Sequence, residues 1–268
     1  MQILFMKLEA IIDKELFLQI KKLLGKAGNG LLDFIYPPIC VHCSTPIIKA
    51  DGLCAKCWKE LIPISEPLCP VLGLPFAVSL GSSVLSAQAI ANPPEFDRAR
   101  SAFIYNDITH SIISKLKYGD RPEMATFCAK IMAGAFAEIL EDSPILVPVP
   151  LHPKRQRQRR YNQSTQLAKE LGLLKGVKVA PMMVARVRET KQQVGLSAKM
   201  REKNVEGAFK VVSDLIEMNI EQRIVIVDDV MTTGATLNAV TKALKKAGYK
   251  KIDVISFARV VNGGEYII

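Results

Sequence analysis

The chain has 268 residues and a mass of 29.6 kDa, with 49% hydrophobic and 23% charged residues. This is globular usage, so it excludes wholesale disorder, a collagen-like chain and a coiled coil, and it suits one large domain or two unequal ones. The net charge is +10, and the stretch from Leu151 to Lys203 alone holds 14 basic and 3 acidic residues. This concentration favours a polyanionic ligand, either a phosphorylated small molecule or nucleic acid, with a solvated surface as the alternative.

The sequence predicts neither secretion nor a membrane span. Within residues 1–35, apolar side chains recur at helical spacing among charged ones, which indicates an amphipathic helix rather than a signal peptide. We expect this helix to dock on the protein's own surface rather than on a membrane or a partner. The charge-free stretch from Pro67 to Pro94 contains Pro70, Gly73 and Pro75, which disfavour a spanning helix. A cytoplasmic location is therefore expected.

Four of the six cysteines form two knuckles, Cys40-Val-His-Cys43 and Cys54-Ala-Lys-Cys57. Four thiolates at this spacing close a tetrahedral structural Zn²⁺ site, so residues 36–66 predict a zinc ribbon. Disulfides or unligated thiols are the alternatives, and the absence of a secretory signal disfavours disulfides. Cys69 does not extend the pattern, because Leu72 stands where a second cysteine would be needed. Residues 67–97 are interpreted as a linker or a degenerate ribbon remnant.

Residues 98–268 alternate between strand and helix patterns, which predicts a doubly wound α/β domain with a parallel sheet. We find no internal repeat, and Cys128 is expected in the core. The expected strands are 102–105, 145–150, 179–186, 224–230 and 252–258, and the expected helices are 108–118, 122–140, 162–174 and 235–247.

The most informative segment runs from Ile224 to Thr236. An apolar strand ends in Asp228 and Asp229, and a turn containing hydroxyl groups and glycine leads into a helix. Backbone N–H groups of such a turn bind phosphate, and the helix dipole assists them. Because carboxylates repel phosphate, the two aspartates suit sugar hydroxyls or Mg²⁺ instead. This combination describes a ribose 5-phosphate site, and the alternative is an ordinary capped strand–turn–helix. The predicted phosphate-binding residues are Thr232, Thr233, Gly234, Ala235 and Thr236.

The segment Asp228–Thr236 resembles the phosphoribosyl pyrophosphate (PRPP) motif of type I phosphoribosyltransferases. More narrowly, the chain resembles the ComF family, in which a cysteine-rich zinc ribbon precedes a phosphoribosyltransferase domain. In this resemblance only Cys69 remains of the further knuckles that family members often carry, which argues against a second metal site. The motifs that carry the resemblance, over about 36–260, are the two cysteine knuckles, Leu116-Lys117-Tyr118, Val147–Leu151, Tyr161-Asn-Gln-Ser164, Gln193–Ser197 with Arg201 and Asn204, and Gly207-Ala-Phe209.

The resemblance implies a Mg²⁺-dependent phosphoribosyltransferase-like protein that binds PRPP and has a role in DNA uptake during natural transformation. Its partners would include single-stranded DNA and competence proteins. Cations must meet the departing pyrophosphate, and Lys117, Arg155 and Arg159 are the candidates. A loop over 186–197 is expected to close over the site. The alternatives are a non-catalytic protein that binds single-stranded DNA and one that senses PRPP on the same fold. The acceptor and the oligomeric state stay open.

Overall fold

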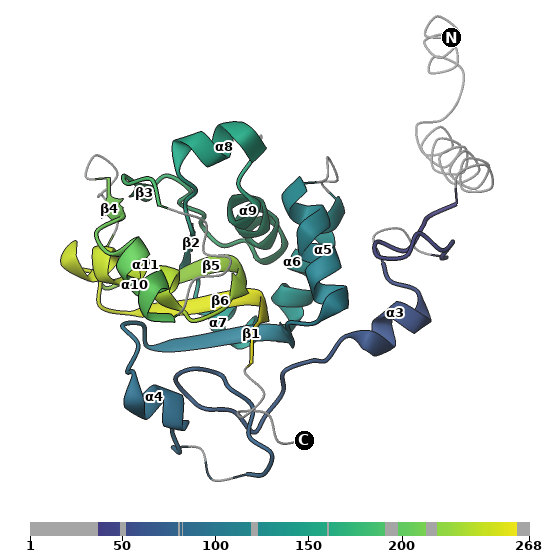
Figure 1. Ribbon diagram of the computed structural model, residues 1–268, viewed down its shortest axis with the longest axis horizontal. Coiled ribbons are helices and arrows are strands. Elements are labelled where there is room, and N and C mark those ends of the chain that lie inside the picture. The colour runs from purple at the N-terminus through teal and green to yellow at the C-terminus, as the bar shows by residue number, and fades with distance from the viewer. Residues whose placement is uncertain are drawn as a thin grey trace, which may run out of the picture. The chain divides into compact units, whose positions relative to one another are not determined.

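The computed structural model describes residues 37–261 except 49–51, 80, 82, 119–122, 160, 191–197 and 213–218. The expected helix in residues 1–35 lies outside the described residues. The chain divides into two compact units, Met1–Cys54 and Ala55–Ile268 (Figure 1). The second unit carries all the strands and helices named below.

Four parallel strands form the central sheet of the second unit, in the order β1-β6-β5-β2. They are β1 (Arg98–Ile104), β2 (Ile145–Pro148), β5 (Ile224–Met231) and β6 (Ile252–Arg259). All eight residues of β6 are buried. Near-continuous burial is typical of a parallel strand covered on both faces, and the apolar run from Ile224 to Val227 is how the sequence encodes it. The predicted parallel α/β fold is thereby confirmed.

Helices cover the sheet on both faces. Alternate residues of β5, Ile224 and Ile226, share one hydrophobic cluster with Leu237 and Val240. Side chains between them point the opposite way along the strand, and the helices α6 and α9 pack against each other and against the strands. Figure 1 shows α5 and α6 side by side, with α9 next to α6. The helices of this unit that bear on the site are α5 (Asp107–Tyr118), α6 (Glu123–Ala135), α7 (Ala137–Glu141), α9 (Gln163–Lys175) and α11 (Ala235–Lys246).

Two expected elements differ from the structure. The helix expected over 122–140 is divided at the buried residue Phe136 into α6 and α7. The strand expected over 179–186 is shortened to β3 (Val184–Arg186), which pairs antiparallel with β4 (Phe209–Val211) in a separate sheet. Val179 makes only an isolated parallel bridge with Leu146. Pro181 follows this bridge, and its missing N–H cannot continue a ladder.

The basic stretch after β2 forms a short helix, α8 (Pro153–Arg159), which was not among the expected helices. Helix α10 (Ala198–Val205) begins directly after the undescribed residues 191–197, and it contacts α11. Among the helices of the described residues, none combines the length and the apolar character needed to cross a membrane.

The segment before β1 packs onto the α/β domain. It begins with α3 (Ala55–Glu60) and ends with α4 (Ala87–Ala91), whose N-cap Ser86 accepts a hydrogen bond from the N–H of Ala89. Between these helices Cys69, Leu72 and Leu74 are buried in the same cluster as strands β2, β5 and β6. Residues around 69–74 therefore belong to the core of the domain.

Candidate functional site

Three elements bring polar side chains together at the carboxyl end of β5. The hydroxyl of Ser164, in the first turn of α9, donates to Asp228 Oδ1 at 2.9 Å. The N–H of Asp229 donates to the same oxygen at 3.0 Å. Lys117 reaches in from the last turn of α5 and places its Nζ 2.7 Å from Asp229 Oδ2. Ligands of open α/β sheets bind at this end of the strands, so this cluster is the candidate binding site.

Asn162 explains how Ser164 is held against Asp228. Its side-chain oxygen caps α9 by accepting from the N–H of Ser164 at 3.1 Å, and its Nδ2 donates to the carbonyl of Val149 at 2.9 Å. One side chain thus ties the start of α9 to the end of β2. Sequence reasoning quoted the motif that contains Ser164 but gave this residue no role. The available signal was its place two residues after a helix-capping Asn.

The carboxyl group of Asp228 has an altered protonation equilibrium. Burial raises its pKa, the charge of Asp229 raises it further, and the hydroxyl of Ser164 and the charge of Lys117 oppose the increase, with a result of about 8. The pKa of Tyr105 is also raised by burial and by Asp229, against the effect of Lys117. At neutral pH the site therefore holds a mostly protonated Asp228 beside the Lys117–Asp229 ion pair.

Replacing Asp228 by asparagine is expected to stabilise the ligand-free protein in solution in a pH-dependent way. The folded pKa of about 8 exceeds the ordinary value of 3.8, so the native state binds a proton that the unfolded chain releases, and stability falls as pH rises between these values. Asparagine stays neutral, so the variant should melt several degrees higher at pH 8.5, since about 1 kcal/mol corresponds to ~2–4 °C.

The difference in melting temperature between Asp228→Asn and the wild type should nearly vanish at pH 4. Thermal unfolding followed by circular dichroism at both pH values measures it. Glu141→Gln, which removes an exposed carboxylate, is the control and should show no such pH dependence. An equal gain at both pH values would contradict the raised pKa.

The turn after β5 presents backbone N–H groups at the start of α11. Gly234 is the N-cap residue, with φ of 77°, and makes no side-chain capping bond. A Cβ at this position would lie 3.3 Å from Met231 Cε in a left-handed conformation that favours glycine. The hydroxyl of Thr233 accepts from the N–H of Ala235 at 3.4 Å, and Thr232 and Thr236 are partly exposed. Such a helix start is suited to an anion.

For the other two candidate cations the structure describes the backbone but not the side chains. Arg155 and Arg159 belong to α8, which follows β2, but their side chains lie outside the described residues. Their neighbour Lys154 pairs with Glu189 at 2.7 Å on an exposed surface. The expected closing loop lies largely outside the described residues, as does the motif Gln193–Ser197. Of the three cations, Lys117 is the one whose side chain is described against the acidic pair.

The two cysteine knuckles converge as expected. The Sγ atoms of Cys40, Cys43, Cys54 and Cys57 all lie within 4.8 Å of one another. Cys43 Sγ and Cys54 Sγ are 3.6 Å apart, close to the ~3.8 Å between sulfur atoms at two corners of a tetrahedron with Zn–S of about 2.3 Å. Four thiols at this spacing fit Zn²⁺ and leave no open coordination position, so the site is structural.

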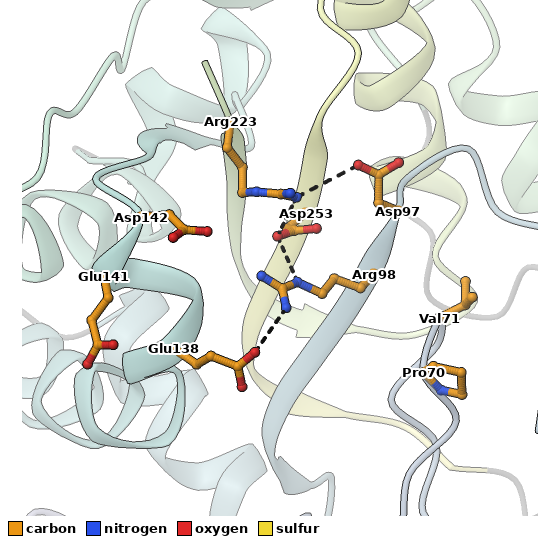
Figure 2. A pocket seen from close by; sticks show the side chains of 9 residues that line it. All are labelled: Pro70, Val71, Asp97, Arg98, Glu138, Glu141, Asp142, Arg223 and Asp253. Carbon is orange, nitrogen blue, oxygen red and sulfur yellow. Dashed lines mark hydrogen bonds and ion pairs between the residues drawn. The ribbon is translucent and has the colours of Figure 1, made fainter. Parts of the chain in front are cut away.

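A second polar cluster lies at the opposite, amino-terminal end of the sheet (Figure 2). Arg98 begins β1, Arg223 precedes β5, and Asp253 lies near the start of β6. Both guanidinium groups point at the fully buried Asp253, with Nε of Arg98 at 2.9 Å and Nη1 of Arg223 at 3.0 Å from its Oδ2. The cluster lines a cavity of about 580 Å³. The two arginines compensate the buried charge of Asp253. The cluster shares no residue with the candidate site on β5.

Comparisons with known families agree with this organisation. Residues 31–89 match the model of the double zinc ribbon domain, and residues 164–266 match that of the phosphoribosyl transferase domain. The sheet, the site at its carboxyl end and the cysteine cluster therefore define a zinc-ribbon protein with a phosphoribosyltransferase domain.

Relatives that match most of the chain narrow the family assignment. Competence protein F of Haemophilus influenzae is 30% identical over 229 residues, which cover 82% of this chain and 96% of that protein. The DNA utilization protein YhgH of Salmonella typhimurium is 28% identical, covering 84% and 98%. Competence protein ComFC of Bacillus subtilis is 26% identical, covering 88% and 98%. The chain belongs to the ComF family.

Proposed function

We propose that the protein binds PRPP with Mg²⁺ at the carboxyl end of β5 and acts as a phosphoribosyltransferase. The observation that carries this proposal is the placement of Asp228 and Asp229 between a basic side chain, Lys117 at 2.7 Å from Asp229, and the start of α11, whose N-cap residue is Gly234. Acidic groups flanked by two anion-binding features match a ligand with hydroxyls between two phosphate groups. PRPP has this order of groups.

Each part of the site has one task in this proposal. The turn Thr232–Thr236 holds the 5-phosphate with backbone N–H groups and hydroxyls. Asp228, oriented by Ser164, and Asp229 accept hydrogen bonds from the ribose hydroxyls or hold Mg²⁺ through their oxygens. Mg²⁺, when bound, supplies positive charge that stabilises the leaving pyrophosphate. Lys117 supplies a further cation from the protein, and Arg155 and Arg159 of α8 are proposed to reach the same phosphates.

Chemistry in this site is mainly positioning and charge stabilisation, because the nucleophile belongs to the acceptor. The ion pair with Asp229 holds Lys117 in place. A bound pyrophosphate would then share the ammonium group with Asp229. In this proposal the protein supplies no nucleophile. The acceptor is defined only by its ability to attack C1 of the ribose.

Titration calorimetry of PRPP with Mg²⁺ tests the proposal. The wild type should bind with micromolar affinity, and Asp228→Ala with Asp229→Ala should weaken binding at least tenfold, which is about 1.4 kcal/mol. Glu138→Ala with Glu141→Ala, on α7, removes the same charge from exposed positions and should bind like the wild type. A folded, zinc-loaded wild type that fails to bind PRPP would refute the proposal.

We further propose that the protein takes part in DNA uptake, as the names of its relatives indicate, with single-stranded DNA and competence proteins as partners. The observation that favours DNA is the charge of residues 151–203, whose side chains Lys154, Arg157, Lys169, Lys175 and Lys178 are exposed. Binding to a phosphate backbone should weaken steeply with salt. The variant lacking Asp228 and Asp229 should still bind DNA, since those residues lie on β5, outside the basic stretch.

A further inference from the structure

Two segments 29 residues apart share one backbone conformation. Isolated antiparallel bridges join Ile39 to Pro46 and Leu68 to Pro75. Inside each bridge, the N–H of the cysteine donates to the carbonyl five residues later at 2.8 Å, from Cys40 in the first segment and from Cys69 in the second. The segment 67–76 therefore repeats the zinc knuckle of 38–47, an internal repeat that was not expected from the sequence.

The agreement extends to the turn itself. Ser44 and Gly73, each four residues after the cysteine, both have φ of 62°. Their N–H groups donate back to the carbonyls of Cys40 at 3.0 Å and Cys69 at 2.8 Å. A residue in the left-handed conformation at this point lets the backbone turn back within four residues. The shared pattern of Pro, apolar residue, Cys and a second Pro six residues after the Cys was visible in the sequence.

The residues that follow the knuckle in each half of the double ribbon also correspond. Cys54 directly precedes α3, and Ser86 directly precedes α4, so Cys57 and Ala89 occupy the same position three residues on. The donors to the first cysteine match as well. Backbone N–H groups of His42, Cys43 and Cys54 hydrogen-bond to Cys40. Those of Val71, Leu72 and Ser86 hydrogen-bond to Cys69.

The second set of positions does not fit a zinc ion. Cys69 is the one remaining sulfur ligand, while Leu72 and Ala89 offer no ligand atom and Ser86 offers a hydroxyl. Zinc sites in proteins use cysteine, histidine or carboxylate ligands. Between Pro67 and Pro94 the sequence contains no His, Asp or Glu and no further Cys. All four positions are buried, so the interior of this half is filled by side chains.

Hydrogen bonds and packing hold the second half together. Cys69 Sγ accepts from the N–H groups of Leu72 and Ser86, both at 3.4 Å. The knuckle is also bonded to the sheet, because the N–H of Ala99 donates to the carbonyl of Val71 at 2.7 Å and the buried Arg259 donates to the carbonyl of Leu72. Leu72 and Leu74 complete the attachment by packing in the core of the domain.

We propose that the second half of the double zinc ribbon, residues 67–91, is a metal-free ribbon in which the Cys69 thiol, Leu72, Ser86 and Ala89 occupy the four ligand positions. The chain then binds one zinc ion, at Cys40, Cys43, Cys54 and Cys57. The metal-free ribbon keeps its fold when that zinc is removed, because its bonds are made to the sheet and to its own thiol.

Zinc content measured by atomic emission on the full chain tests this proposal. The wild type and Cys69→Ala should each hold one zinc per chain, as should Cys128→Ala, a control at another buried cysteine. Cys40→Ser with Cys43→Ser should hold none. Two zinc ions in the wild type, or loss of zinc from Cys69→Ala, would overturn the proposal.

Restoring the ligands gives a second, independent test. The variant Leu72→Cys, Ser86→Cys, Ala89→Cys should bind two zinc ions, and a folded variant that binds one would show that these positions are not equivalent to the ligands of the first half. If the variant does not fold, hydrogen exchange of the wild type tests the proposal instead. Removing zinc with a chelator should leave amide protection over 69–76 unchanged, and its loss there would refute the proposal.

Discussion

Replacing Asp253 by alanine is expected to lower the free energy of unfolding by about 2–4 kcal/mol. The side chain is fully buried and its Oδ2 accepts hydrogen bonds from Arg98 and Arg223 (Figure 2). Removing one partner of a buried ion pair typically costs ~3–5 kcal/mol. The expected cost is somewhat smaller here, because the arginine side chains are 25% and 26% exposed and water screens part of the lost interaction.

Urea unfolding followed by circular dichroism measures this loss. Glu138→Ala is a matched control, since Glu138 approaches the same Arg98 at 3.5 Å but its side chain is 89% exposed. Exposed pairs contribute ~0–1 kcal/mol, so the control should stay close to the wild type. Equal stability of Asp253→Ala and Glu138→Ala would contradict the role assigned to the buried carboxylate.

Replacing Gly73 by alanine is expected to cost about 2–4 kcal/mol. The residue has φ of 62°, which costs an L-residue ~1–2 kcal/mol. An added Cβ would also overlap the carbonyl oxygen of Ala99 in β1, and relieving such overpacking costs about 1–3 kcal/mol more. Backbone atoms cannot move away as a flexible side chain could, so the metal-free ribbon would be displaced from the sheet.

Gly207→Ala separates the two contributions to the Gly73 effect. Gly207 has the same φ of 62°, but nothing lies within 4 Å of an added Cβ. Its replacement should cost only the backbone strain. The difference in unfolding free energy between the two variants then reports the contact of residue 73 with β1. If both variants lose the same stability, the close packing of the ribbon on β1 contributes nothing.

The sequence alone determined those features whose physical cause is local. Two cysteine knuckles need only short spacings, and a strand that runs into Asp228, a glycine-containing turn and a helix is contained in thirteen consecutive residues. The unbroken apolar run of β5 predicts its burial on both faces. For these reasons the ribbon, the parallel sheet and the position of the acidic pair at its carboxyl edge could be predicted.

Only the tertiary structure decided which side chains meet across the fold. The pairing of Lys117 with Asp229 joins residues 112 positions apart, and the bond from Ser164 to Asp228 spans 64. The same holds for the second ribbon half, because three of its four ligand positions carry Leu72, Ser86 and Ala89, while its shape depends on backbone bonds and on packing against β1. Motif reasoning detects the ligands of a knuckle, whereas hydrogen bonds and burial preserve its shape. The residues that hold such a knuckle together without metal ligands become visible only when the chain is folded.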